Sequence, residues 1–249
     1  GLENFKFFLT SPRVVRVVWN TLFLNISFIV VHTALQITGA LLLSELRSKW
    51  YKRLMQSLTF LPYFVSWIIV SVFVYNLLNY DYGALNRLLV TLGFERVAFY
   101  SQPELWPVIL ILVDSWKWIG FGIIIYLATL SGISPEYYEA ATIDGASRLQ
   151  QIRHITLPLL LPTVSILSLL ALGKVLNADF GMFYGIIGDN SVLFPTTDVV
   201  DTFVFRALRV LGDIGMASAV GFLQSIVGFF MVLGSNLAVR RLHPEGALF

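Results

Sequence analysis

Five apolar segments, each long enough to cross a lipid bilayer, constrain the fold of this chain more than any other feature of its sequence. A transmembrane helix needs about 20 mostly apolar residues, and the windows that meet this length lie at about 19–44, 54–78, 105–130, 157–176 and 217–239. Charged residues make up only 13% of the chain, and its mean hydropathy is +0.76. A membrane barrel would show short alternating strands instead. The sequence therefore predicts an all-α integral membrane protein with a single transmembrane domain, 1–249, built on five helices.

Lys and Arg residues predict the direction of the spans, because short loops rich in these residues stay on the cytoplasmic side of a membrane. They gather at 47–53, in the segment 134–158 and at 240–241. Two crossings separate each of these segments from the next, which places all three on one face, the cytoplasmic face. The loops 79–104 and 177–213 are then predicted to lie outside. The sequence does not begin with Met, and whether a further helix precedes it stays open.

A polar insert, 134–158, separates the third span from the fourth and is predicted to form two short helices. Ser134 is expected to cap a helix that runs to about Ile143, and Gly145 permits a tight reversal after it. The capping-box pattern that begins at Ser147 predicts the second helix. A polar element of this kind, held on one side of the bilayer, indicates a contact with another protein.

The insert carries a spaced pattern of acidic, small and apolar residues. Glu139-Ala140-Ala141 is followed after three residues by Gly145, and after nine more by Ile155-x-Leu157-Pro158. This spacing resembles the EAA loop of the transmembrane subunits of bacterial ABC importers, which lies between the third and fourth of five core helices. The resemblance implies a five-helix importer-permease core whose cytoplasmic two-helix insert couples to an ATPase. The coupling residues that it implies are Glu139, Ala140, Ala141, Asp144, Gly145, Ile155, Leu157 and Pro158.

The residues of the insert also suggest how it is held. Small side chains at 140–141 would let another surface approach the backbone closely. Glu139 could pair with Arg148 or Arg153 across the turn, and Pro158 is expected to fix the angle at which the chain returns to the membrane. The alternative is a loop helix that lies on the membrane surface without a partner.

Four further segments resemble carbohydrate-type permeases, among them permeases for oligosaccharides and polysaccharides, including the alginate importer. These segments are 20–23, 177–180, 201–206 and 219–225. The resemblance implies a multi-pass permease of the bacterial cytoplasmic (inner) membrane that translocates a saccharide. It also implies three partners besides lipid: an external solute-binding protein, a dimer of ATPase subunits and a second permease subunit, which we expect to be a different chain.

Polar residues in the third span are candidates for the substrate path, because an ionisable residue inside a bilayer needs a partner or water. Asp114 and Lys117 lie three residues apart and could simply neutralise each other. Alternatively this face lines the path, with Trp116 or Trp118 stacked on sugar rings and Lys117 attracting an anionic substrate. Aromatic residues are also common at membrane interfaces, so both interpretations stay open.

A second group of candidates follows the fourth span. Lys174 either extends to the membrane surface or faces the substrate, and Asn177 and Asp179 could bind a substrate hydroxyl. The polar residues inside the first and fifth spans are expected to join helices by hydrogen bonds rather than to bind ligands. These residues are Asn25, His32, Gln36 and Gln224.

Several classes of function are disfavoured by what the sequence contains. There is no Cys, and the net charge of +2 gives no reason to expect nucleic acid. No phosphate-binding loop of the G-x-x-x-x-G-K-[ST] kind occurs, so we expect ATP and Mg²⁺ on a separate ATPase subunit and no cofactor or metal on this chain. The sequence shows no cluster of nucleophile, base and orienting residue and no cluster of metal ligands, so we do not expect an enzyme. A secondary transporter, a channel subunit and an importer permease for a solute other than sugar remain alternatives, and the saccharide itself stays open.

Overall fold

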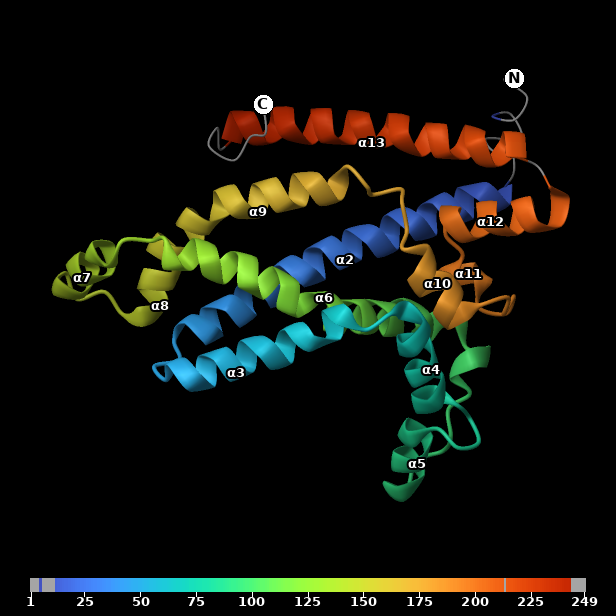
Figure 1. Ribbon diagram of the computed structural model, residues 1–249, viewed down its shortest axis with the longest axis horizontal. Coiled ribbons are helices and arrows are strands. Elements are labelled where there is room, and N and C mark those ends of the chain that lie inside the picture. Colours follow the sequence, from blue (N-terminus) through green and yellow to red (C-terminus); the bar gives the residue numbers. More distant parts are fainter. Residues whose placement is uncertain (1–4, 6–11, 213, 243–249) are drawn as a thin grey trace. The chain divides into compact units, whose positions relative to one another are not determined.

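The described part of the chain folds into helices joined by turns and loops (Figure 1). The computed structural model describes residues 5, 12–212 and 214–242, and no strand occurs among them. Three short elements, η1 to η3, are 3₁₀ turns, and η4 is a π-helical turn. In chain order the elements are α2 (Pro12–Ser44), α3 (Lys49–Phe60), η1 (Leu61–Phe64), α4 (Trp67–Leu78), α5 (Ala84–Thr91), η2 (Phe99–Ser101), η3 (Pro103–Leu105), α6 (Trp106–Ser131), α7 (Pro135–Ile143), α8 (Arg148–Gln151), η4 (Ile152–Thr156), α9 (Leu157–Leu172), α10 (Phe180–Ile187), α11 (Phe194–Thr197), α12 (Val200–Leu211) and α13 (Ile214–Leu242).

Four helices among the described residues are long and apolar enough to cross a membrane. They are Arg13–Ser44, Pro103–Ser131, Arg148–Leu172 and Ile214–Arg241. An interrupted pair, Lys49–Phe64 with Trp67–Leu78, makes a fifth span if it is counted as one. An α-helix satisfies its own backbone hydrogen bonds, which lipid cannot do. The prediction of an all-α membrane protein is therefore confirmed, with four or five spans.

The prediction of one unbroken helix at 54–78 is wrong. The helix α3 ends at Phe60, tightens into the 3₁₀ turn η1, and a new helix begins at Trp67. Pro62 explains the break, because its ring lacks an N–H donor and collides with the carbonyl of the preceding turn. Ser66 then caps the new helix by accepting a hydrogen bond from the backbone N–H of Ile69, at 3.5 Å.

The chain forms two compact units, and several helices begin in one and end in the other. The first unit comprises the described residues of Gly1–Phe28, Phe64–Asp114 and Lys174–Phe229. Its core lies where α4 packs on α10: Val70, Val74 and Leu78 follow one another at helical spacing and are buried. Trp106 is fully buried at the start of α6, and its indole N–H donates to the carbonyl of Phe99 at 2.8 Å.

The second unit comprises the described residues of Ile29–Tyr63, Ser115–Gly173 and Phe230–Phe249. Its core joins the end of α2, through Ala40 and Leu43, to α6 and to Leu160 of α9. The helices α6 and α3 approach each other very closely at Gly120. A Cβ atom added there would overlap the carbonyl group of Thr59 and would lie 2.7 Å from the Cα of Phe60. Only glycine therefore allows this packing.

We predict that Gly120→Ala destabilises the second unit, because backbone atoms of α3 stand where the new methyl group would lie. Overpacking of this kind costs about 1–3 kcal/mol. Gly221→Ala is the matched control, since nothing lies within 4 Å of a Cβ at that helical position. Thermal unfolding of the detergent-solubilised protein should show a lower midpoint for Gly120→Ala and an unchanged or higher one for Gly221→Ala. Equal midpoints would contradict the close packing.

Candidate functional site

The first helix of the insert forms as the sequence predicts. The helix α7 spans Pro135–Ile143, and the hydroxyl of Ser134 accepts a hydrogen bond from the backbone N–H of Glu136 at 3.4 Å. Proline at the first helical position and an acidic residue in the first turn both favour a helix start. Both predicted ends of this helix are confirmed.

The turn after α7 depends on the left-handed backbone of Gly145, where φ is +80°. The backbone N–H of Gly145 donates to the carbonyl of Thr142 at 3.1 Å, and that of Ala146 to the carbonyl of Ala141 at 2.8 Å. These two bonds form a Schellman motif, which ends a helix by satisfying its last carbonyls. A side chain at position 145 would strain the backbone by about 1–2 kcal/mol. The left-handed backbone at position 145 therefore explains why the spaced pattern has glycine there.

The second half of the insert runs into the membrane helix without a break. The backbone N–H of Ser147 donates to Oε1 of Gln150 at 2.7 Å, which is the side-chain half of the predicted capping box. The helix α8 then continues through the π-helical turn η4 into α9. Pro158 lies in the first turn of α9, directly after the π-helical turn, and its role in setting the entry angle stays a prediction. A wider turn just before a proline relieves the clash of its ring with the preceding carbonyls.

Side-chain hydrogen bonds lock the two helices of the insert together. Gln151 is buried, and its amide donates to the hydroxyl of Thr142 at 2.9 Å. The hydroxyls of Tyr138 and Thr156 lie 3.0 Å apart and share a hydrogen bond. Because these bonds join α7 to α8 and to the π-helical turn, the insert behaves as one rigid piece at the ends of α6 and α9 (Figure 1).

An ion pair fastens the insert to the end of α2. The guanidinium of Arg148 donates to the carboxylate of Glu45 from both Nε and Nη2, at 3.0 and 2.5 Å. It also contacts the ring of Tyr138, 5.6 Å from the ring centroid. Glu139 forms no ion pair within the described part of the chain. The expected pairing of Glu139 with Arg148 or Arg153 is therefore wrong, because Arg148 is already held by Glu45.

One face of the insert is exposed and mixes apolar with polar groups. Ile143 is 87% exposed and Leu149 is 75% exposed. The side chains of Glu139, Ala140 and Asp144 are exposed as well. Ala141 and Ile155 are partly buried, and Leu157 and Pro158 are exposed. Two large apolar side chains beside small and acidic ones suit a protein contact better than water.

The three candidate residues of the third span have different surroundings. Trp116 is 46% exposed. Lys117 is buried, and its ammonium group donates to the carbonyls of Pro62 and Tyr63 at 3.3 and 3.0 Å. It thereby binds the last carbonyls of η1, where a helix end carries partial negative charge. Trp118 is partly buried, with its ring edge-on to that of Tyr63 at 5.3 Å. The structure thus adds a third interpretation of Lys117, as a cap on the interrupted span.

The other three candidates lie where the chain leaves α9. This helix ends at Leu172, earlier than the predicted boundary near 176, and Lys174, Asn177 and Asp179 are all exposed. Asp179 caps α10 and accepts a hydrogen bond from the indole N–H of Trp67 at 2.6 Å. An exposed carboxylate beside an indole is an arrangement that binds sugar hydroxyls and sugar rings well.

Polar side chains from three helices hold the unwound backbone between α9 and α10. Asn25 of α2 donates to the carbonyl of Val175 at 2.8 Å, and Gln224 of α13 donates to that of Leu176 at 2.7 Å. Asp201 of α12 accepts from the backbone N–H of Ala178 at 2.7 Å. Burial raises the pKa of Asp201, and this hydrogen bond partly opposes the shift. Asn25 and Gln224 therefore bind structural backbone groups, but in an unwound segment and not, as expected, in a neighbouring helix.

A family model described as "Binding-protein-dependent transport system inner membrane component" matches residues 36–243. This match covers most of the chain and all of the insert. The chain belongs to this family.

This permease is similar over nearly its whole length to a curated relative and to two solved structures. The polygalacturonan/rhamnogalacturonan transport system permease protein YteP of Bacillus subtilis (strain 168) is 33% identical over 246 residues, which cover 99% of this chain and 76% of the relative. A bacterial alginate ABC transporter, solved in complex with an alginate pentasaccharide-bound periplasmic protein, contains a chain that is 33% identical. The TM-score is 0.92, with 97% of this permease and 83% of that chain covered. A second structure of a transporter that imports the acidic polysaccharide alginate gives a TM-score of 0.91 at 33% identity, with 98% and 84% covered.

Several residues that shape the site of the permease could not be identified from its sequence. Glu45 and Gln151 hold the insert, and Trp67 pairs with Asp179, yet each partner is distant in the chain or hidden in an ordinary polar stretch. The one available signal was charge: Glu45 is an acid at the end of a span, next to a basic loop.

We predict that Gly145→Ala impairs coupling in the permease, because alanine at φ +80° would strain the Schellman turn by about 1–2 kcal/mol. Gly132→Ala is the matched control in the same region, since the nearest atom to its Cβ would lie 3.4 Å away. In the assembled transporter, substrate-stimulated ATP hydrolysis should fall in Gly145→Ala and persist in Gly132→Ala. Full stimulation in both would show that the turn does not matter.

We predict that the ion pair between Glu45 and Arg148 helps to position the insert. Its side chains are 44% and 56% exposed, so the pair contributes only about 0.2–1 kcal/mol. Glu45→Arg and Arg148→Glu should each reduce transport, and the double exchange should restore part of it. A double-mutant cycle on uptake rates measures this coupling. Purely additive losses would mean that the two residues act independently.

Proposed function

We propose that this chain is a transmembrane permease subunit of an ATP-driven importer for an oligosaccharide or polysaccharide. The observation that carries the proposal is the insert, with its internal hydrogen bonds and its exposed face, which lies inside the segment that the family model matches. A structured polar element without a function would not need two large exposed apolar side chains beside a specifically terminated helix.

The coupling step follows from how the insert is built. The exposed residues 139–145 would dock on a cytoplasmic ATPase subunit, and ATP with Mg²⁺ would bind to that partner. Hydrogen bonds through Gln151 and Thr156 make the insert rigid, and no break separates it from α9. A displacement of the docked face would therefore move α9 directly, which is how we propose that access switches from one side of the membrane to the other.

The saccharide class is supported by the proteins that this chain is similar to. One relative is named for polygalacturonan and rhamnogalacturonan, and the solved structures are of alginate transporters. One of those structures contains a periplasmic binding protein. We propose by analogy that an external solute-binding protein delivers the saccharide, that a second permease subunit completes the path, and that the assembly lies in a bacterial cytoplasmic membrane.

The candidate residues of the substrate path remain part of this proposal. Asp179 beside Trp67, with Asn177 nearby, is the stronger group, because a carboxylate next to an indole suits a saccharide. Trp116 offers a half-exposed ring to the same ligand class. Lys117 and Trp118 are the weaker candidates, since the ammonium group of Lys117 is engaged with backbone carbonyls. Lys174 is exposed and could contribute charge.

We predict that saccharide-loaded binding proteins stimulate ATP hydrolysis by the purified transporter, and that Glu139→Lys abolishes this stimulation. The substitution reverses a charge on the exposed face without removing a contact inside the insert. Uptake should fall to the background level while the permease still reaches the membrane. Glu136→Lys, an exposed acid one turn earlier in α7, is the control.

Two outcomes would contradict the proposal in different ways. If Glu139→Lys transports like the wild type, this face does not dock on the ATPase. If no saccharide-loaded binding protein stimulates the wild-type transporter while one loaded with another solute does, the substrate class is wrong and the coupling role stands.

A further inference from the structure

A pocket of about 460 Å³ opens beside the start of α2, within the first unit. Arg13 and Arg16 of α2 form one side, and the segment with Phe194, Pro195 and Asp198 forms the other. Small-molecule sites usually measure about 300–1,000 Å³. Neither the coupling insert nor the group around Asp179 uses this pocket.

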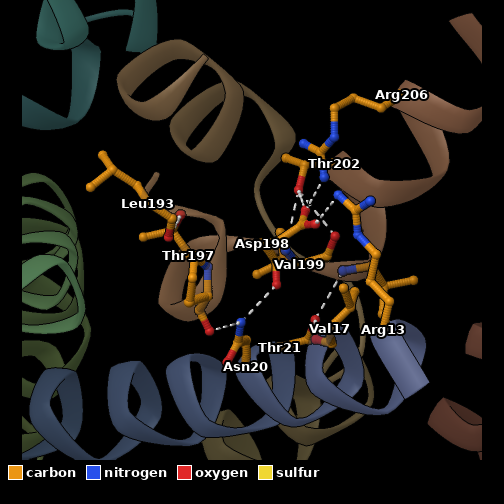
Figure 2. Close-up of polar contacts among 12 residues, drawn as sticks. Arg13, Val17, Asn20, Thr21, Leu193, Thr197, Asp198, Val199, Thr202 and Arg206 are labelled. Atoms are coloured by element: carbon orange, nitrogen blue, oxygen red, sulfur yellow. Dashed lines mark hydrogen bonds and ion pairs between the residues drawn. The ribbon is translucent and has the colours of Figure 1, made fainter. Parts of the chain in front are cut away.

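The carboxylate of Asp198 is fixed firmly at the pocket (Figure 2). Asp198 is 3% exposed, and its Oδ1 accepts hydrogen bonds from Thr202, at 2.9 Å, and from Arg206. Its backbone carbonyl accepts from the side chain of Asn20 at 3.1 Å. The side chain therefore cannot turn toward water, and its second oxygen keeps one orientation.

That second oxygen, Oδ2, has no hydrogen-bond partner among the described residues. Nη2 of Arg13 lies 3.8 Å from this oxygen, which is beyond hydrogen-bond distance. A buried acceptor that lacks a donor is unfavourable. A ligand hydroxyl in the pocket would supply the missing donor.

The pocket also has an excess of positive charge. The side chain of Arg13 is 60% exposed, and Arg16 is exposed and forms no ion pair in the described part of the chain. Arg206 and, at 3.8 Å, Arg13 share the carboxylate of Asp198, so three arginines stand against one acid at the pocket. They lie on the side of the membrane that the loop charges predict to be external. The preference of Lys and Arg for the cytoplasmic side therefore does not account for them. A guanidinium fork suits a carboxylate.

An apolar wall completes the pocket. Phe194 and Pro195 line it, and the guanidinium of Arg206 covers the ring of Phe194 at 4.1 Å from the ring centroid. The ring is therefore held in place. A ligand that matches all three features carries a carboxylate, at least one hydroxyl donor and an apolar ring face.

We propose that this pocket is a subsite for one uronate residue of an acidic saccharide. The carboxylate of the uronate would bind Arg16 and Arg13, and a ring hydroxyl would donate to Oδ2 of Asp198. This inference rests on the proposed saccharide import and adds that the saccharide is acidic, as is the alginate imported by one similar transporter. A lipid phosphodiester would suit the arginines but carries no hydroxyl donor itself; a headgroup such as that of phosphatidylglycerol would supply one, so this lipid is the occupant that the test must exclude.

The test measures equilibrium binding of trigalacturonate and its methyl ester to the assembled transporter in phosphatidylcholine nanodiscs. The ester should bind at least about tenfold more weakly, because it lacks the charge. Arg16→Gln should lower the affinity for trigalacturonate about tenfold, and Arg16→Lys, which keeps the charge but not the planar fork, should lower it less. Arg16 has no ion pair in the described structure, so neither change removes one.

Arg87→Gln is the matched control, because Arg87 is an exposed cation of the segment 79–104 outside the pocket. Its affinity should equal that of the wild type. The proposal is overturned if wild-type protein does not bind trigalacturonate, if Arg16→Gln binds it equally well, or if the ester binds as tightly. It is also overturned if the wild-type protein loses trigalacturonate binding when phosphatidylglycerol replaces phosphatidylcholine and this loss requires Arg16. A lipid headgroup would then be the occupant. If saccharide-loaded binding proteins still stimulate ATP hydrolysis by the wild-type transporter, the proposed function stands and only the subsite is wrong. If they do not, the proposed function itself fails.

Discussion

Backbone groups freed where membrane helices are interrupted must find hydrogen-bond partners inside the protein, because lipid offers none. Much of the polar architecture of this chain meets that need. Lys117 binds the last carbonyls before the break at Pro62. Asn25, Gln224 and Asp201 hold the unwound segment after α9. These few polar side chains allow one span to be interrupted and another to end in unwound backbone, and interrupted helices are where ligands find backbone and side-chain partners in membrane proteins.

The insert has a different requirement, since it must be rigid and must also expose a surface to another protein. A Schellman turn at Gly145 and hydrogen bonds through Gln151 fix its two helices against each other. The absence of a break between α8 and α9 makes it an extension of a membrane helix. Its exposed apolar side chains, Ile143 and Leu149, are turned away from its own core and are accessible to a partner. Rigidity and exposure together are what a coupling element needs.

The sequence predicted the helical class, the position of the spans and both helices of the insert, because apolar length and capping residues act locally. It predicted structural hydrogen bonds from Asn25 and Gln224, but not that both would hold the unwound segment after α9. It did not predict the break at Pro62, since apolar length alone does not register how one ring ends a helix. Nor did it predict Glu45 as the partner of Arg148, 103 residues away, or the orphaned oxygen of Asp198, because both depend on tertiary packing.

The central claim is that the exposed face of the insert contacts a cytoplasmic ATPase subunit. The chain has no Cys, so single cysteines can be introduced at Ile143, on that face, and at Val90, on the segment predicted to lie outside. Cross-linking in the assembled transporter should join position 143 to the ATPase subunit, and position 90 should give no such product. A cross-link to the ATPase from position 90 and none from position 143 would contradict both the docking surface and the orientation of the chain.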